Sequence, residues 1–103
     1  MARIKVEWSV EANQDLIDIL EFYITRNGSS VYSKKLYSKI NKSIKSLSKN
    51  PFLGAKTGDP DIRAFINGDF QVIYGVFDKL ILVILIWDCR RDTEDKVIDT
   101  RRK

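Results

Sequence analysis

The residues best suited to chemistry in this sequence are cations beside strand-like segments. Arg90 and Arg91 follow an unbroken run of eight apolar residues, Leu80–Trp87, while Arg63 opens another strand-like run and Lys56 lies in the loop before it. An arginine is always charged, and its planar guanidinium can bind a carboxylate or a phosphate through two hydrogen bonds. If Arg63 and Arg91 share one face of a sheet, they form a positive pair that suits an anionic ligand or the acidic groups of a protein partner.

Each of these arginines also has a structural alternative. The C-terminal pair has Asp88 and Asp92 as immediate neighbours, and Arg63 has Asp61 and Asp69 close by in the sequence. An exposed ion pair of this kind contributes little to stability, and the sequence does not decide between such pairing and ligand binding.

Two residue types are scarce enough to exclude whole classes of site. The sequence has no histidine and one cysteine, Cys89. Ser-His-Asp and Cys-His nucleophile pairs are therefore excluded, as are histidine metal sites. One cysteine can form neither an internal disulfide nor a cysteine-based zinc site, so we expect no metal and no cofactor.

No segment of the sequence reads as a membrane or export signal. The apolar run Leu80–Trp87 is far shorter than the roughly 20 residues of a transmembrane helix. Charges at Arg3, Lys5 and Glu7 interrupt the N-terminal stretch in which a signal peptide would have its apolar core. We therefore expect a cytoplasmic protein with no membrane partner.

Charge is segregated along the chain, whose formal net charge is +4. Between Glu11 and Glu21 every charged residue is acidic, and between Lys34 and Lys56 every charged residue is lysine. A lysine run of this length is typical either of a solvated helix face or of a surface that meets a polyanion or an acidic protein.

Hydrophobic periodicity predicts a strand followed by two helices in the first half of the chain. The segment Ile4–Trp8 alternates apolar and polar residues, and Ser9 is a suitable N-cap for a helix over Val10–Arg26. Apolar residues at helical spacing predict a second helix over Val31–Lys49, which Asn50-Pro51 ends.

Three strand-like runs follow a loop predicted over Pro51–Asp61. They span Ile62–Ile66, Phe70–Phe77 and Leu80–Trp87, and the third, being apolar throughout, is typical of a strand covered on both faces or near the sheet centre. The order predicts one α+β domain over residues 1–103, with a polar tail from about residue 92. Its helical hairpin should pack on a largely antiparallel four-stranded sheet.

Five stretches of the chain, in this order, resemble the RelE/ParE superfamily of bacterial toxins from type II toxin–antitoxin systems. They are VEWSVEANQDLIDILEFYI (Val6–Ile24), SLSKNPFLG (Ser46–Gly54), IRAFINGDFQVIYGV (Ile62–Val76), LILVILIW (Leu80–Trp87) and DCRRD (Asp88–Asp92). The resemblance implies a strand-helix-helix-strand-strand-strand fold and a cognate antitoxin that holds the toxin inactive. RelE-like members cut messenger RNA in the ribosome without a metal, whereas ParE-like members act on DNA gyrase.

The resemblance also implies which residues bind a target or an antitoxin. Arg63 matches the arginine that opens the hairpin, Arg91 or its neighbour Arg90 matches the basic residue past the last strand, and Tyr74 matches a hairpin tyrosine that packs in the core. Gln71 stands where the ribosome-dependent nucleases have an arginine, and no tyrosine or histidine follows Arg91. These departures favour the ParE-like branch.

Three functions follow as hypotheses. The first is a ParE-like toxin that inhibits DNA gyrase by protein contact. The second is a RelE-like ribosome-dependent endoribonuclease, in which Arg63 and Arg91 stabilise charge at the scissile phosphate and Lys56 assists. The third is a basic nucleic-acid-binding module without toxicity, whose binding weakens steeply with salt.

Overall fold

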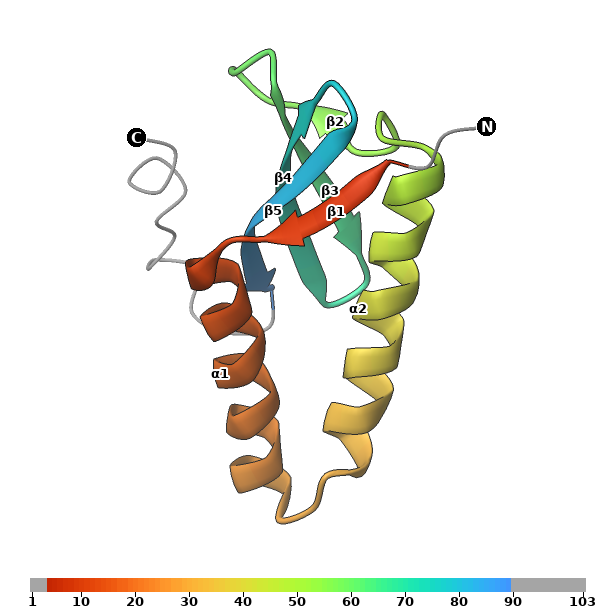
Figure 1. Cartoon of the computed structure of the whole chain (residues 1–103). Helices are drawn as coiled ribbons and strands as arrows, with labels where there is room; N and C mark the ends of the chain where they lie inside the picture. Colours follow the sequence, from red (N-terminus) through yellow and green to blue (C-terminus); the bar gives the residue numbers. More distant parts are fainter. Residues whose placement is uncertain (1–3, 90–103) are drawn as a thin grey trace.

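Two helices pack on one face of a five-stranded sheet in the computed structural model, which describes residues 4–89 (Figure 1). The elements in chain order are β1 (Lys5–Trp8), α1 (Val10–Asn27), α2 (Val31–Lys49), β2 (Ala55–Lys56), β3 (Ile62–Asn67), β4 (Phe70–Phe77) and β5 (Leu80–Asp88). The predicted α+β class and the helical hairpin are confirmed. The predicted polar tail from about residue 92 lies outside the described residues.

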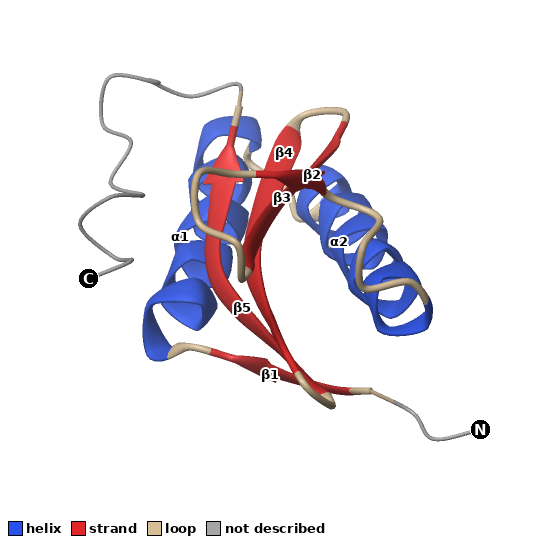
Figure 2. Ribbon diagram, turned by 90° about the horizontal axis from the view of Figure 1, so that it is seen from above, coloured by secondary structure: helices blue, strands red, loops and turns tan. Residues whose placement is uncertain are grey.

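The strands lie in the order β1-β5-β4-β3-β2 and twist across the helices (Figure 2). β1 pairs with β5 in parallel, and every other neighbouring pair is antiparallel. The prediction of four strands is wrong, because β2 forms inside the segment predicted as a loop, where Ala55 and Lys56 pair with Ala64 and Arg63 of β3. A strand of two residues carries no alternating pattern, so only its pairing with β3 defines it.

Local signals in the sequence fix both ends of α1. The side chain of Ser9 accepts a hydrogen bond of 2.9 Å from the amide of Ala12, as expected of an N-cap. Gly28 ends the helix with a positive φ of 67° and donates its amide to the carbonyl of Ile24, a conformation that glycine adopts without steric cost.

β5 lies between β1 and β4, which confirms the interpretation of the apolar run as a strand near the sheet centre. One of its faces contributes to the main core under the helices, and the other contributes Leu85 to a small cluster with Ile62 and Ile73. The main core combines buried residues from both helices and from β4 and β5: Ala12, Ile19, Tyr23, Leu36, Ile40, Ile44, Leu47, Phe70, Val72, Tyr74, Ile81, Val83 and Ile86.

Ser9 and Asp15, at and near the start of α1, form hydrogen bonds with the part of β5 that does not pair with β1. β1 pairs with β5 only as far as Val83, and the hydroxyl of Ser9 donates to the carbonyl of Ile84 at 3.1 Å. Six residues further along the chain, a carboxylate oxygen of Asp15 accepts a hydrogen bond of 3.1 Å from the amide of Ile86. Backbone groups at a strand edge thereby gain partners, which also anchors α1 against the sheet.

Within residues 4–89, no helix is both long and apolar enough to cross a membrane.

Candidate functional site

Arg63 and Lys56 are direct cross-strand neighbours on the face of the sheet that bears the helices. Arg63 on β3 pairs with Lys56 on β2 and with Tyr74 on β4. Residues that pair directly project from the same face, and Tyr74 belongs to the core under the helices. Arg63 is half-buried, whereas Lys56 is exposed.

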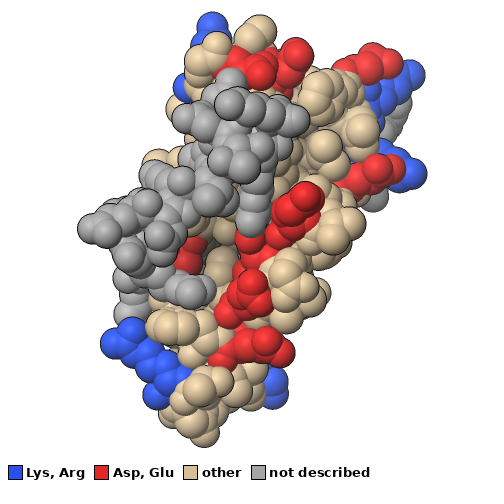
Figure 3. Space-filling model, turned by 90° about the vertical axis from the view of Figure 1, so that its left-hand side faces the viewer, with Lys and Arg blue, Asp and Glu red and all other residues tan. Residues whose placement is uncertain are grey.

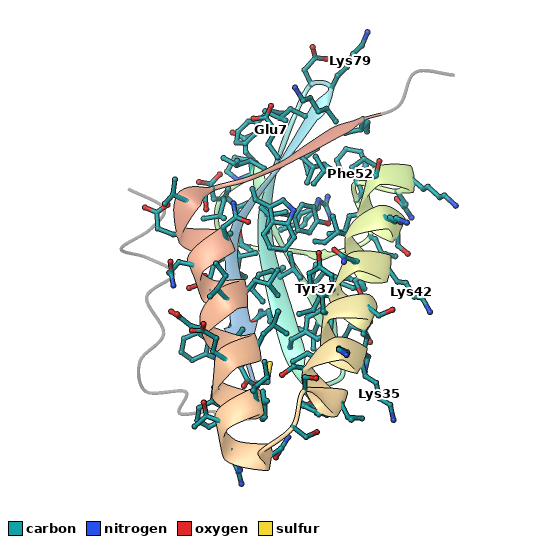
Figure 4. All side chains as sticks on the ribbon, turned by 60° about the horizontal axis from the view of Figure 1, so that its bottom comes forward. Glu7, Lys35, Tyr37, Lys42, Phe52 and Lys79 are labelled. Atoms are coloured by element: carbon teal, nitrogen blue, oxygen red, sulfur yellow. The ribbon has the colours of Figure 1, made fainter. Side chains whose placement is uncertain are left out.

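The guanidinium of Arg63 binds backbone carbonyls of the turn that follows α2. Its Nη1 donates to the carbonyl oxygen of Gly54 at 2.7 Å and to that of Phe52 at 3.3 Å. Its Cζ lies 4.8 Å from the ring centroid of Phe52, within the range of a cation–π interaction. Phe52 itself lies next to the C-terminal end of α2 (Figure 4) and is 63% exposed. The charged group is thus held in place without any carboxylate.

The hydroxyl of Tyr74 fixes the same turn from the core side. It donates to the carbonyl of Pro51 at 2.8 Å and accepts from the amide of Gly54 at 2.9 Å. Burial raises the pKa of Tyr74 above its usual 10.0, and the hydrogen bond from Gly54 and the charge of Arg63 offset part of this effect. The hydroxyl therefore stays protonated and keeps its donor role well above neutral pH.

Arg63 and Lys56 form a pair of like charges that the rest of the described chain does not neutralise. Within residues 4–89, the one ion pair joins Lys5 to Glu7 at 3.2 Å, so neither member of the pair contacts a carboxylate. Like charges directly opposite one another in a sheet repel, and an anionic group supplied from outside would relieve that repulsion. The arrangement can hold a carboxylate or a phosphate, with Arg63 as the rigid member.

Comparison with known proteins identifies the family of this chain. A family model described as "ParE toxin of type II toxin-antitoxin system, parDE" matches residues 6–93, which is most of the sequence. The chain belongs to the ParE toxin family. No curated protein sequence matches it closely enough to count as a relative.

Solved structures show that this ParE-family chain has the RelE/ParE fold. A chain of the chromosomal ParDE toxin–antitoxin system from P. aeruginosa matches with a TM-score of 0.71 and 22% identity, over 82% of this chain and 95% of that one. A chain of the RelBE2 toxin–antitoxin complex from Mycobacterium tuberculosis matches with a TM-score of 0.63 and 13% identity, over 84% and 99%. The YoeB dimer from Staphylococcus aureus matches with a TM-score of 0.57 and 24% identity, over 84% and 97%.

The structure brings together two of the site residues that the sequence of this ParE-family chain suggests. Arg63 and Lys56 are adjacent, and Arg63 pairs with neither Asp61 nor Asp69, the structural alternatives considered for it. Arg90 and Arg91 lie outside the described residues, so their part in the site stays a prediction.

The register places the exit of β5 away from Arg63. The end of β5 at Asp88 is opposite Phe70, and Phe70 is opposite Asn67. Asn67 is four residues along β3 from Arg63, which corresponds to roughly 13 Å of strand. Any shared site between Arg63 and Arg91 therefore depends on the course of the chain after Cys89.

Sequence reasoning missed the turn that positions Arg63. Nothing in the spacing of residues indicates that Phe52 and Gly54 supply carbonyls to this guanidinium. The available signal was the stretch SKNPFLG, which resembles the family's helix-terminating segment and marks the turn as a defined feature rather than a loose loop.

A surface hollow on the opposite face of the sheet is separate from the cation pair. It has a volume of about 330 Å³, and neither Arg63 nor Lys56 lines it. Three carboxylates and four apolar side chains are among its lining residues, which are Ser9, Glu11, Asp59, Asp61, Ile62, Phe77, Leu82 and Ile84. The hollow and the cation pair thus carry side chains of opposite charge.

Proposed function

We propose that this chain is the toxin of a type II toxin–antitoxin pair, that it binds and inhibits DNA gyrase, and that a cognate antitoxin neutralises it in the cytoplasm. The match of residues 6–93 to the ParE toxin family carries this proposal. Two similar structures, one from a ParDE toxin–antitoxin system and one from the RelBE2 toxin–antitoxin complex, support the existence of an antitoxin partner.

The surface around Arg63 supports action through protein contact. Phe52 and Leu53 are 63% and 45% exposed, and they lie beside a guanidinium that the turn holds in place. Exposed aromatic side chains and arginines are enriched in protein interfaces and often dominate their binding energy. We assign this surface, with Lys56 opposite Arg63 and together with Arg90 and Arg91, to the contact with the target or the antitoxin.

The adjacency of Arg63 and Lys56 favours one alternative, a RelE-like ribosome-dependent ribonuclease. Two cations on neighbouring strands can bind a phosphate and stabilise the charge that develops when its ester bond breaks. In that reaction Arg63 and Arg91 would bind the scissile phosphate and Lys56 would assist. The ParE family match weighs against this alternative.

Induction of the protein alone in a bacterium separates the two functions. Gyrase inhibition predicts growth arrest with DNA breaks while translation continues, and co-expression with the antitoxin restores growth. Growth arrest with rapid loss of translation and cut messages would support the ribonuclease. Growth without arrest, in cells where the folded protein accumulates, would remove both toxin functions.

Single substitutions test the assigned surface in the same assay. Lys56→Gln and Arg91→Ala should reduce toxicity, whereas Lys79→Gln, which removes one charge from the exposed turn between β4 and β5, should leave it unchanged. Full toxicity in both Lys56→Gln and Arg91→Ala would show that the target binds elsewhere.

A further inference from the structure

The outer side of α2 carries six lysines, all exposed, and no acidic residue lies anywhere in this helix. We call this set the lysine ridge: Lys34, Lys35, Lys39, Lys42, Lys45 and Lys49. None of the six forms an ion pair within residues 4–89, where the one salt bridge joins Lys5 to Glu7. The ridge is therefore a surface of six positive charges without compensating carboxylates.

Helix geometry makes the ridge continuous. At 100° per residue its six positions fall within an arc of about 140°, opposite the buried side of the helix that Leu36, Ile40, Ile44 and Leu47 form. From its first to its last lysine the ridge is about 22 Å long at 1.5 Å per residue. Lys35 and Lys42 point away from the sheet and from α1 (Figure 4).

The charge of the ridge is local to one side of the molecule. Asp and Glu side chains run down the face on which α1 lies (Figure 3), and the exposed acidic residues of that helix are Glu11, Asp18 and Glu21. The loop between α1 and α2 lies beyond the sheet (Figure 1), so the first half of α2 is accessible from outside. An anionic partner would meet α2 first and be repelled by the α1 face.

The residue types and burial of α2 favour nucleic acid over a membrane or a protein as the anionic partner of the ridge. The apolar side of α2 is buried in the core, so this helix cannot lie in a membrane interface. Lysine is depleted in protein interfaces, whereas protein–DNA interfaces are strongly positive and polar. Single-stranded nucleic acid is bound through aromatic stacking platforms, whereas Tyr37, which is 47% exposed on α2, lies about 60° outside the arc of the lysines at 100° per residue.

The width of the major groove favours duplex DNA over duplex RNA as the partner of the ridge. The major groove of B-form DNA is wide enough for an α-helix, and lysines on both flanks of a 140° arc can then reach phosphates of both strands. The major groove of duplex RNA is too narrow and deep for this arrangement.

We propose that the lysine ridge of α2 binds the phosphate backbone of duplex DNA without sequence specificity. This property goes beyond gyrase inhibition, because it needs no second protein. Binding of this kind would keep the toxin on DNA, which is the substrate of gyrase, its proposed target.

Fluorescence anisotropy with a labelled mixed-sequence DNA duplex tests the proposal over a range of salt concentrations. The variant is Lys42→Gln/Lys45→Gln, and the matched control is Lys5→Gln/Lys79→Gln, which removes the same charge from exposed positions outside α2. Glutamine and lysine have similar helix propensities, so thermal unfolding should show that both proteins fold like the parent.

The parent chain should bind with an affinity that falls steeply as salt rises. The ridge variant should bind more weakly at low salt, and its slope of log K against log salt should shrink by about 1.8, or 0.9 for each lost phosphate contact. The control should keep the parent's slope. Equal losses in the two variants, or tighter binding to an RNA duplex of the same sequence, would overturn the proposal. No gyrase is present in this assay, so its outcome is independent of the proposed function.

Discussion

Replacing Tyr74 with phenylalanine should destabilise the protein through the loss of one hydroxyl group. The Tyr74 hydroxyl bridges the carbonyl of Pro51 and the amide of Gly54, and the side chain is fully buried. Phenylalanine keeps the ring and its packing, so the core loses no apolar contact. What changes is the turn after α2, which also carries the carbonyls that hold Arg63.

The size of the effect follows from the burial of the groups left behind. Gly54 is buried, so its amide cannot turn to water when the hydroxyl is gone, whereas Pro51 is half-exposed and its carbonyl can be solvated. An unsatisfied buried donor costs about 1–3 kcal/mol. In a domain of this size each kcal/mol lowers Tm by about 4–8 °C, so we expect a decrease of about 5–20 °C.

Thermal and urea unfolding of Tyr74→Phe, followed by circular dichroism, measure this cost. Tyr37→Phe is the matched control, because Tyr37 is 47% exposed and makes no hydrogen bond within the described residues. The control should change the free energy of unfolding by less than about 0.5 kcal/mol. If both variants unfold alike, the Tyr74 hydroxyl does not hold the turn and the explanation given for the position of Arg63 is wrong.

Three further predictions concern the same framework. Because the folded protein raises the pKa of Tyr74, its contribution to stability should be complete below pH 10.0 and lost as pH rises above it, so the difference in unfolding free energy between the parent and Tyr74→Phe should shrink in that range. Gly54→Ala should destabilise by about 1–3 kcal/mol in urea unfolding, because a Cβ there would lie 2.7 Å from the Tyr74 hydroxyl and 2.9 Å from a backbone oxygen, whereas Gly58→Ala meets nothing within 4 Å and should be nearly neutral. Asp15→Ala should cost about 1–2 kcal/mol and speed amide hydrogen exchange at Ile86, whose amide loses its carboxylate partner.

Local patterns were sufficient to predict most of the secondary structure. Ser9 caps α1 as expected, the second helix spans the predicted residues Val31–Lys49, and the apolar run after Leu80 forms an inner strand. These features depend on neighbours in the sequence, through capping and periodicity, so the sequence shows them directly.

Features that depend on distant partners could not be predicted in this way. β2 exists because Ala55 and Lys56 meet β3, and the parallel pairing of β1 with β5 joins segments that are 75 residues apart, as Lys5 and Leu80 show. The candidate site also combines a feature that the local sequence shows with features that depend on distant partners. Arg63 was identified from its place at the start of a strand and from the family resemblance, but its adjacency to Lys56 and its binding to carbonyls arise only when the turn after α2 folds against β3.

A supercoiling assay with the purified protein tests the central claim most directly. DNA gyrase, relaxed plasmid and ATP are incubated with increasing amounts of the chain, and a parallel ribosomal translation reaction receives the same amounts. Our account predicts a dose-dependent loss of supercoiling while the message in the translation reaction stays intact. Unimpaired supercoiling together with a cleaved message would contradict it.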